Sequence, residues 1–362
     1  MSASDSSSAV VVLAAGAGTR MKSDLQKTLH SIGGRSLISH SLYAAAGLNP
    51  EHIVAVIGHR RDQVGPAVDS VAEKLGREVR IALQEEQNGT GHAVQCAMDQ
   101  LEGFAGTVIV TNGDVPLLTS GTLAALLEAH TAAPTAVTVL TMRLDDPTGY
   151  GRIVRNQDGE VIAIVEQKDA SDEERSITEV NSGVFAFDAT LLRDALSQLK
   201  SDNAQGELYL TDVLGIARNG GHPVRAHIAG DARELAGVND RVQLAEAGAE
   251  LNRRNVEVAM RGGATVIDPQ STWIDVEVSV GRDVIIRPGT QLLGTTSIGD
   301  RAEIGPDTTL ENMSIGAGAS VIRTHALDSE IGADATVGPF TYIRPGTVLG
   351  AEGKLGGFVE TK

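Results

Sequence analysis

The last third of the chain places an aliphatic residue at every sixth position. Two series show this spacing: Ile274, Val280, Ile286, Leu292, Ile298, Ile304 and Leu310, and then Ile331, Val337, Ile343, Leu349 and Leu355. A helix repeats after about 3.6 residues and a strand after about two, so neither explains the spacing. A hexapeptide parallel β-helix does, because each short strand turns one aliphatic side chain inward and small or polar residues form the corners. The sequence therefore predicts a β-helix over residues 263–362.

Two details of this region qualify the prediction. Between the two series, the segment HALDSE with His325 is expected to be an irregular insertion. The final repeat, LGGFVETK, has no polar cap, which the end of a solenoid normally needs. We therefore expect the chain to stop inside a longer β-helix, because it is shortened or because another subunit covers the end.

The first part of the chain, up to about residue 130, alternates short apolar runs with helical stretches. This alternation predicts an α/β domain with a doubly wound parallel sheet. The expected strands are Val10–Ala15, Ile53–Ile57, Val79–Leu83, Thr107–Thr111 and Val137–Met142. The expected helices are Leu37–Ala46, Asp62–Lys74, His92–Leu101 and Thr122–His130. Such sheets bind ligands at the carboxyl ends of their strands.

The middle of the chain predicts a hairpin, a further strand and a long helix. Two alternating runs within Arg152–Glu166 flank an Asp-Gly turn, and Val180–Phe187 follows an exposed, mobile loop, DASDEERS. Good helix formers over Asp240–Met260 predict a connecting helix. The expected division is a disordered tip (1–8), a nucleotide-binding domain (9–238), the connecting helix (239–262) and the β-helix (263–362).

A Gly-rich turn with two basic residues follows the first expected strand. Gly16 and Gly18 allow a sharp turn whose amides approach an anion, and Arg20 and Lys27 follow. The turn is not a Walker A loop, which needs Gly-Lys-Ser/Thr, and a dinucleotide fingerprint needs glycine where Met21 stands. A purely structural turn stays open at this point, but the basic pair favours a phosphate-binding loop.

Composition excludes several classes of function. The formal charge of −17 argues against a nucleic-acid surface, so an anionic substrate needs local cations or a metal. No apolar run approaches the length of a membrane span, and the start, MSASDSSS, does not resemble a signal peptide. The single cysteine, Cys96, cannot form an internal disulfide and is expected to be a buried thiol, which suits a reducing cytoplasm.

Several motifs together resemble one enzyme family. LAAGAGTRM, QEEQNGTGHA, NGDVPLL, PTGYGRI, IVEQKDA, EVNSG, NAQGELYLTD and GVNDR, followed by FTYIRPG and FVETK, are similar to the bifunctional N-acetylglucosamine-1-phosphate uridylyltransferase/glucosamine-1-phosphate N-acetyltransferase (GlmU) family. The resemblance implies a Rossmann-like nucleotidyltransferase domain followed by a left-handed β-helix. It also implies Mg²⁺-dependent transfer of UMP from UTP to N-acetylglucosamine 1-phosphate, which yields UDP-N-acetylglucosamine, a peptidoglycan precursor, and pyrophosphate.

The resemblance assigns site residues one by one. Arg20 and Lys27 would act on the phosphates, and Asp114 and Asn239 would hold Mg²⁺. The nucleotide-binding residues would be Leu13, Ala14, Ala15, Gly16, Gln84, Gly89, Thr90, Asn112 and Gly113, with Gln87 a weaker candidate. The sugar-binding residues would be Gly151, Glu166, Asn181, Tyr209, Thr211 and Asn239.

In the acetyltransferase half, Arg344 and Lys362 match residues that hold the phosphate of glucosamine 1-phosphate. The family's catalytic His lies beyond FVETK, and the residues for acetyl-CoA are also missing, so we expect no acetyl transfer by these 362 residues. The family resemblance further implies a cytoplasmic homotrimer.

Three alternatives remain open from the sequence. The first is another sugar-1-phosphate nucleotidyltransferase that uses dTTP, ATP or GTP. The second is a non-catalytic assembly subunit with the same folds, although such a scaffold would not require Arg20, Lys27, Asp114 and Asn239 together. The third is an acyltransferase alone, which the incomplete second half weakens.

Overall fold

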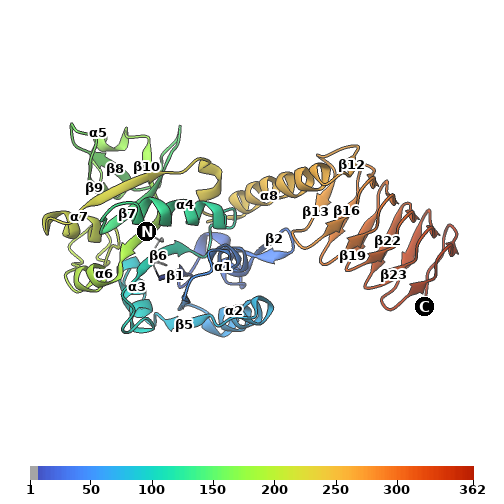
Figure 1. Cartoon of the computed structure of the whole chain (residues 1–362), viewed down its shortest axis with the longest axis horizontal. Helices are drawn as coiled ribbons and strands as arrows, with labels where there is room; N and C mark the ends of the chain where they lie inside the picture. The colour runs from blue at the N-terminus through green and yellow to red at the C-terminus, as the bar shows by residue number, and fades with distance from the viewer. Residues whose placement is uncertain (1–6) are drawn as a thin grey trace, which may run out of the picture. The chain divides into compact units, whose positions relative to one another are not determined.

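The computed structural model describes residues 7–362 (Figure 1). The described chain divides into two compact units, residues 7–30 with Ser36–Gln243, and Ser31–Arg35 with Leu244–Lys362. The expected disordered tip, residues 1–8, lies outside the described residues except for its last two. Of these, Ser8 is already the first residue of a strand.

The first unit is built on a mixed sheet in the order β11-β7-β10-β6-β1-β4-β5. These strands are β1 (Ser8–Leu13), β4 (His52–Ile57), β5 (Arg80–Leu83), β6 (Thr107–Asn112), β7 (Val137–Arg143), β10 (Glu179–Asp188) and β11 (Val224–Ile228). The hairpin β8 (Arg152–Arg155) and β9 (Val161–Val165) joins the sheet through β10. The short strands β2 (Ser31–Ile32) and β3 (Arg35–Ser36) pair with each other.

The strands of the predicted doubly wound sheet run parallel to one another, and β10, whose direction the sequence did not indicate, is the exception in the strand order given above. This strand runs antiparallel to both of its neighbours, β6 and β7. β10 is reached from the β8–β9 hairpin and pairs antiparallel with β8, whereas parallel neighbours are joined by helical crossovers. The chain therefore enters the middle of the sheet in the reverse direction.

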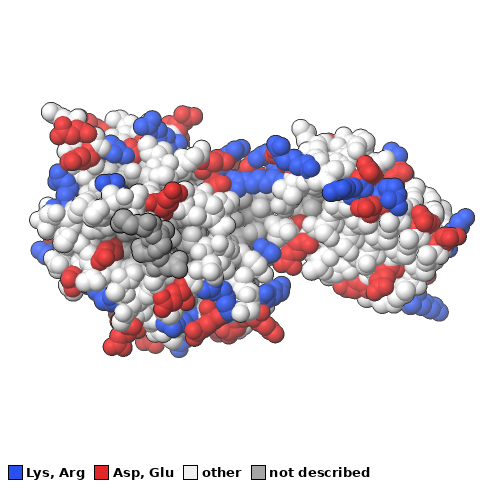
Figure 2. Space-filling model, viewed as in Figure 1, with Lys and Arg blue, Asp and Glu red and all other residues white. Residues whose placement is uncertain are grey.

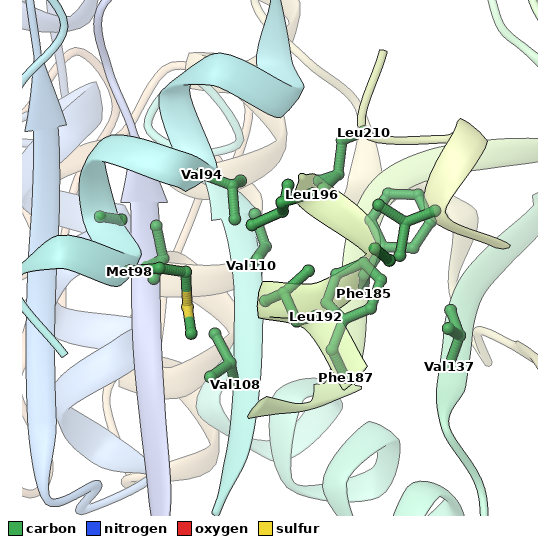
Figure 3. Packing of buried hydrophobic residues seen from close by; sticks show 14 of the residues in the cluster. Val94, Met98, Val108, Val110, Val137, Phe185, Phe187, Leu192, Leu196 and Leu210 are labelled. Carbon is green, nitrogen blue, oxygen red and sulfur yellow. The ribbon is translucent and has the colours of Figure 1, made fainter. Parts of the chain in front are cut away.

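Helices cover both faces of this sheet (Figure 1). One face is packed by α1 (Leu37–Gly47), α2 (Arg61–Leu75) and α4 (Ser120–Thr131), and the other by α3 (Thr90–Asp99), α6 (Ala189–Leu196) and α7 (Asp212–Asn219). Alternate residues of β1 point to opposite faces, so Ala9 and Val11 join one core and Val10 and Val12 the other. Figure 3 shows part of the first core, where Val94 and Met98 of α3 lie beside β6.

Two local predictions needed correction. The loop DASDEERS contains a single helical turn, α5 (Asp172–Arg175), because Ser171 and Glu174 form a capping box. Cys96 is only partly buried, and burial and nearby Asp99 raise the pKa of its thiol. The segment predicted as a long helix forms α8 (Arg241–Arg261).

The second unit contains three parallel sheets of short strands, the architecture of a left-handed β-helix. Its strands are β12 (Thr265–Val266), β13 (Trp273–Ile274), β14 (Ser279–Val280), β15 (Ile285–Ile286), β16 (Gln291–Leu293), β17 (Ser297–Ile298), β18 (Glu303–Ile304), β19 (Thr309–Glu311), β20 (Ser314–Ile315), β21 (Ser320–Val321), β22 (Thr324–Leu327), β23 (Glu330–Ile331), β24 (Thr336–Val337), β25 (Thr341–Ile343), β26 (Val348–Leu349) and β27 (Lys354–Leu355). The aliphatic residues of the six-residue series form its core.

The expected irregular insertion at HALDSE is wrong. This segment contains β22, which pairs in register with β19 and β25. The core continues from Leu310 through Ile315, Val321 and Ala326 to Ile331, so three of the four steps are five residues long. The repeat is shortened at its corners, and the small side chain of Ala326 hides the pattern in the sequence.

Candidate active site

The Gly-rich turn leaves β1 at the carboxyl edge of the sheet. β1 lies between β4 and β6 and runs parallel to both. The amide of Ala14 donates to the Val56 carbonyl at 2.8 Å, and that of Gly113 donates to the Leu13 carbonyl at 2.8 Å. The ends of three strands are thereby tied together beneath the turn.

Four polar side chains from distant parts of the sequence converge beside this turn. Lys27 Nζ pairs with the Asp114 carboxylate and lies 3.4 Å from Asn239 Oδ1. Arg20 Nη2 donates to the same Asn239 oxygen at 2.8 Å. The backbone carbonyl of Asp114 accepts from the Val238 amide at 2.9 Å, which holds the GVNDR segment against the end of β6. The structure thus brings together the predicted phosphate-binding and metal-binding residues.

A cleft of about 260 Å³ opens between the turn and α3. Most of the predicted nucleotide-binding residues line it, namely Leu13, Ala14, Ala15, Gly16, Gln84, Gly89, Thr90 and Asn112, together with Gln87, Lys27 and Asp114. Gly113 does not line the cleft. Its place is beneath the turn, where a Cβ would lie 3.1 Å from that of Ala14.

The loop that contains the predicted nucleotide-binding residues Gln84 and Gly89 is held in a defined shape. Gln84 Nε2 donates to the Gly89 carbonyl at 2.9 Å, and Gln87 Nε2 donates to the Ala15 carbonyl at 2.7 Å. Gly89 has φ 103°, and a Cβ there would lie 2.5 Å from the carbonyl of Leu208, so this position requires glycine. The hydrogen bond from Gln87 to Ala15 holds this loop next to the Gly-rich turn.

Four of the predicted sugar-binding residues, Gly151, Glu166, Asn181 and Thr211, lie together near the β8–β9 hairpin, whereas Asn239 lies with Arg20 and Lys27. The Asn181 amide donates to the Gly151 carbonyl at 2.8 Å, and Thr211 Oγ1 donates to Glu166 Oε1 at 3.5 Å. Burial, reinforced by neighbouring acidic groups, raises the pKa of Glu166 although Thr211 opposes the shift. Tyr209, two residues before Thr211, is also buried, and its hydroxyl accepts a hydrogen bond from Gln205 Nε2 at 2.9 Å.

A β-bulge in β10 lies next to the cleft. The pairing of β10 with β7 shifts register between Asn181 and Val184. Gly183, in this bulge, has φ 78°, and a Cβ there would lie 2.5 Å from Asn112 Nδ2 at the end of β6. Bulges redirect side chains at functional sites, and this one places Gly183, two residues after Asn181, beside a residue that lines the cleft.

Asp114 and Asn239 fit a magnesium ion. Their oxygens both contact the single ammonium group of Lys27, so they converge on one cation-sized position. Mg²⁺ prefers hard oxygen ligands and is commonly held by one or two protein groups plus substrate phosphates and water. Among the described residues no cluster of three or more His, Cys, Asp or Glu side chains is placed to hold a metal ion.

In the β-helix, Arg344 donates to Glu360 through Nε at 2.8 Å. Lys362 is exposed, and His325 stacks on Tyr342 with ring centroids 5.6 Å apart. Figure 2 shows acidic and basic side chains interspersed on the visible face, so the net negative charge does not gather in one patch there. No helix in the described part of the chain is long and apolar enough to cross a membrane.

Sequence reasoning missed two polar groups around the site. Gln26 is 2% exposed and contacts both the Gly-rich turn and Thr28. Glu179 is 8% exposed and pairs with Arg155 of the hairpin. A glutamine before a lysine and a glutamate at the start of a strand carry no sequence signal of their own, because their partners are set by tertiary contacts.

Comparisons with known proteins agree with this geometry. A family model described as the MobA-like NTP transferase domain matches residues 10–209. The bifunctional protein GlmU of Corynebacterium efficiens is 89% identical over 362 residues, which cover 100% of this chain and 74% of that protein. The bifunctional protein GlmU of Mycolicibacterium gilvum is 61% identical over 358 residues, covering 99% of this chain and 72% of that protein.

A solved structure named as a glucose-1-phosphate thymidylyltransferase from Bacillus anthracis, in complex with a sucrose, is similar in fold alone. It aligns with a TM-score of 0.54 and 20% sequence identity over 67% of this chain and 95% of that chain. A doubly covered sheet with a phosphate-binding turn at its carboxyl edge, matched by an NTP transferase model, defines a nucleotidyltransferase. Within that class, the chain belongs to the GlmU family.

Proposed function

We propose that the first unit transfers the uridylyl group of UTP to N-acetylglucosamine 1-phosphate, giving UDP-N-acetylglucosamine and pyrophosphate. The observation that carries the proposal is the cluster of Arg20, Lys27, Asp114 and Asn239, two of which, Lys27 and Asp114, line the cleft. Two polyanions can meet only where fixed positive charge offsets their repulsion, and this cluster lies where the two phosphates would approach each other.

The reaction requires positioning more than proton transfer. The attacking phosphate of the sugar is largely dianionic at neutral pH, because its second pKa is about 6, so no general base is needed. The amides of the Gly-rich turn, Arg20 and Lys27 bind the triphosphate and stabilise charge on the leaving pyrophosphate. Glu166 and Asn181 orient the sugar through hydrogen bonds to its hydroxyl and acetamido groups, and a substrate lacking those groups would leave buried polar atoms unpaired.

Asp114 and Asn239 would hold Mg²⁺ together with the substrate phosphates. When bound, the ion supplies further neutralisation of phosphate charge. Lys27, which pairs with Asp114 in this structure, then has the triphosphate as an alternative anionic partner. We further propose that the protein is a cytoplasmic homotrimer, in which neighbouring β-helices cover exposed strand edges. Light scattering that finds only monomer at micromolar concentration would contradict the trimer.

A substrate panel tests the proposal. The chain is incubated with Mg²⁺, one of UTP, dTTP, ATP or GTP, and one of several sugar 1-phosphates, and released pyrophosphate is measured. We expect turnover to be highest with UTP and N-acetylglucosamine 1-phosphate. Preference for dTTP with glucose 1-phosphate would favour a different sugar nucleotidyltransferase, and no turnover with any pair would favour an assembly subunit.

A further inference from the structure

Gln26 is deeply buried although it lies in the loop between η1 (Thr19–Met21) and η2 (Lys27–Leu29). Both the nitrogen and the oxygen of its side-chain amide form hydrogen bonds. Nε2 donates to the Gly16 carbonyl at 2.8 Å, and Oε1 accepts from the amide and from the hydroxyl of Thr28, each at 2.6 Å. One side chain therefore links the Gly-rich turn to the residue that follows Lys27.

The backbone of Gln26 is held as well. Its amide donates to Gln63 Oε1 on α2 at 3.0 Å, and Gln63 Nε2 donates to the Asp24 carbonyl at 3.2 Å. The turn also packs directly on the lysine, because a Cβ at Gly18 would collide with the Cβ of Lys27. Helix α2, the loop that contains Gln26 and the Gly-rich turn are thus joined by hydrogen bonds around Lys27.

We propose that Gln26 is a positioning residue for uridylyl transfer, which holds Lys27 and the Gly-rich turn in the arrangement that receives the triphosphate. This inference rests on the function proposed above. Lysine has a long, flexible side chain, so its ammonium group reaches a defined point only if its backbone is fixed. Only a side-chain amide of this length supplies the donor for Gly16 and the acceptor for Thr28 together.

Two substitutions of Gln26 separate these contacts. Gln26→Met keeps the length but removes donor and acceptor, and Gln26→Glu keeps an acceptor for Thr28 but loses the donor to Gly16. Since a misplacement of about 1 Å can cost about 100-fold in rate, we expect Gln26→Met to lower kcat about 10- to 100-fold. Gln26→Glu, which also buries a carboxylate against the Gly16 carbonyl oxygen, should lower kcat at least as much. The KM for the sugar phosphate should change less than about twofold, because other elements form that pocket.

Gln198→Met is the matched control. Gln198 is exposed, and its amide donates only to the Asp194 carbonyl, at 3.1 Å. This variant should keep the parent kcat. Circular dichroism melts of all variants report whether each is folded at the assay temperature. A folded Gln26→Met variant with the parent's kcat would overturn the proposal.

A double-mutant cycle tests whether Gln26 acts through Lys27. In a Lys27→Met background, adding Gln26→Met should lower kcat by a smaller factor than it does in the parent, because only the Gly-rich turn then remains to be positioned. If the fold-decreases in kcat of the two single variants multiplied in the double variant, Gln26 would not act through Lys27 and the proposal would be overturned. A parent chain that transfers no uridylyl group would contradict the proposed function itself, whereas an active parent with an unimpaired Gln26→Met variant contradicts only the role of Gln26.

Discussion

The ion pair between Arg155 and Glu179 should fasten the β8–β9 hairpin, which the proposed function places beside the sugar, to the central sheet. Arg155 of β8 donates to the Glu179 carboxylate through Nη2 at 2.6 Å and Nε at 2.8 Å, and Thr141 Oγ1 of β7 donates to it at 2.9 Å. Glu179 lies two residues before Asn181 on β10, so both side chains belong to the same face of the strand. Loosening the pair should therefore disturb the sugar pocket.

The substitution Glu179→Gln removes the charge but keeps the shape. Glu179 is 8% exposed, whereas the side chain of Arg155 is 31% exposed and its guanidinium can regain water. The substitution should therefore lower stability less than breaking a fully buried ion pair would. We expect the free energy of unfolding to fall by about 1–3 kcal/mol. The KM for N-acetylglucosamine 1-phosphate should rise several-fold, and that for UTP should stay near the parent value.

The difference between variant and parent should depend on pH with a defined sign. Burial opposes ionisation of Glu179, but hydrogen bonds from Arg155 and Thr141 outweigh it and hold its pKa below the ordinary value. A lowered pKa contributes stability that is present above the unfolded-state pKa and is lost as pH falls through the folded-state pKa. The difference in unfolding free energy between the parent and Glu179→Gln should therefore be constant near neutral pH. It should shrink as the pH falls below the unfolded-state pKa of about 4.3.

The assay is urea unfolding followed by two signals. The chain's one tryptophan, Trp273, lies in the second unit, so its fluorescence reports that unit, and helical circular dichroism reports mainly the first. Glu179→Gln should shift the dichroism transition and leave the fluorescence transition in place. An unshifted dichroism transition at pH 7, together with an unchanged KM for the sugar phosphate, would refute the reasoning.

Three further predictions concern the phosphate-binding turn, the metal ligands and acid stability. Gly18→Ala should lower kcat/KM for UTP at least about tenfold in steady-state assays, because its φ of 62° disfavours a side chain and a Cβ would displace Lys27; parent-like turnover would contradict this. Asp114→Ala with Asn239→Ala should abolish turnover and weaken Mn²⁺ binding in calorimetry; turnover at the parent rate would remove the basis of the proposed function. Burial lowers the pKa of His130 to about 4, so the parent should lose up to about 3 kcal/mol of unfolding free energy as pH falls from about 6.5 to 4. His130→Gln lacks this ionisable group and should lose correspondingly less in urea titrations over the same range. Parallel pH profiles would contradict that prediction.

The sequence by itself determined the architecture where local patterns repeat. The six-residue aliphatic spacing predicted the β-helix, because each inward position depends only on its own short strand and on equivalent neighbours. The Gly-rich turn and the strand before Asp114 predicted where ligands bind, because carboxyl ends of parallel strands share one edge. The pattern failed at Ala326, since a small inward residue in a shortened repeat carries no aliphatic signal.

Only the tertiary structure decided how the two halves of the site meet. The reversed direction of β10 and its bulge bring Gly183, two residues after Asn181, against Asn112, and nothing local in the sequence specifies that contact. The contacts of Gln26 and Glu179 likewise depend on partners far along the chain or across a loop. Such contacts arise from the order of strands in the sheet, a property of the folded chain as a whole, and therefore leave no periodic trace in the residues that make them.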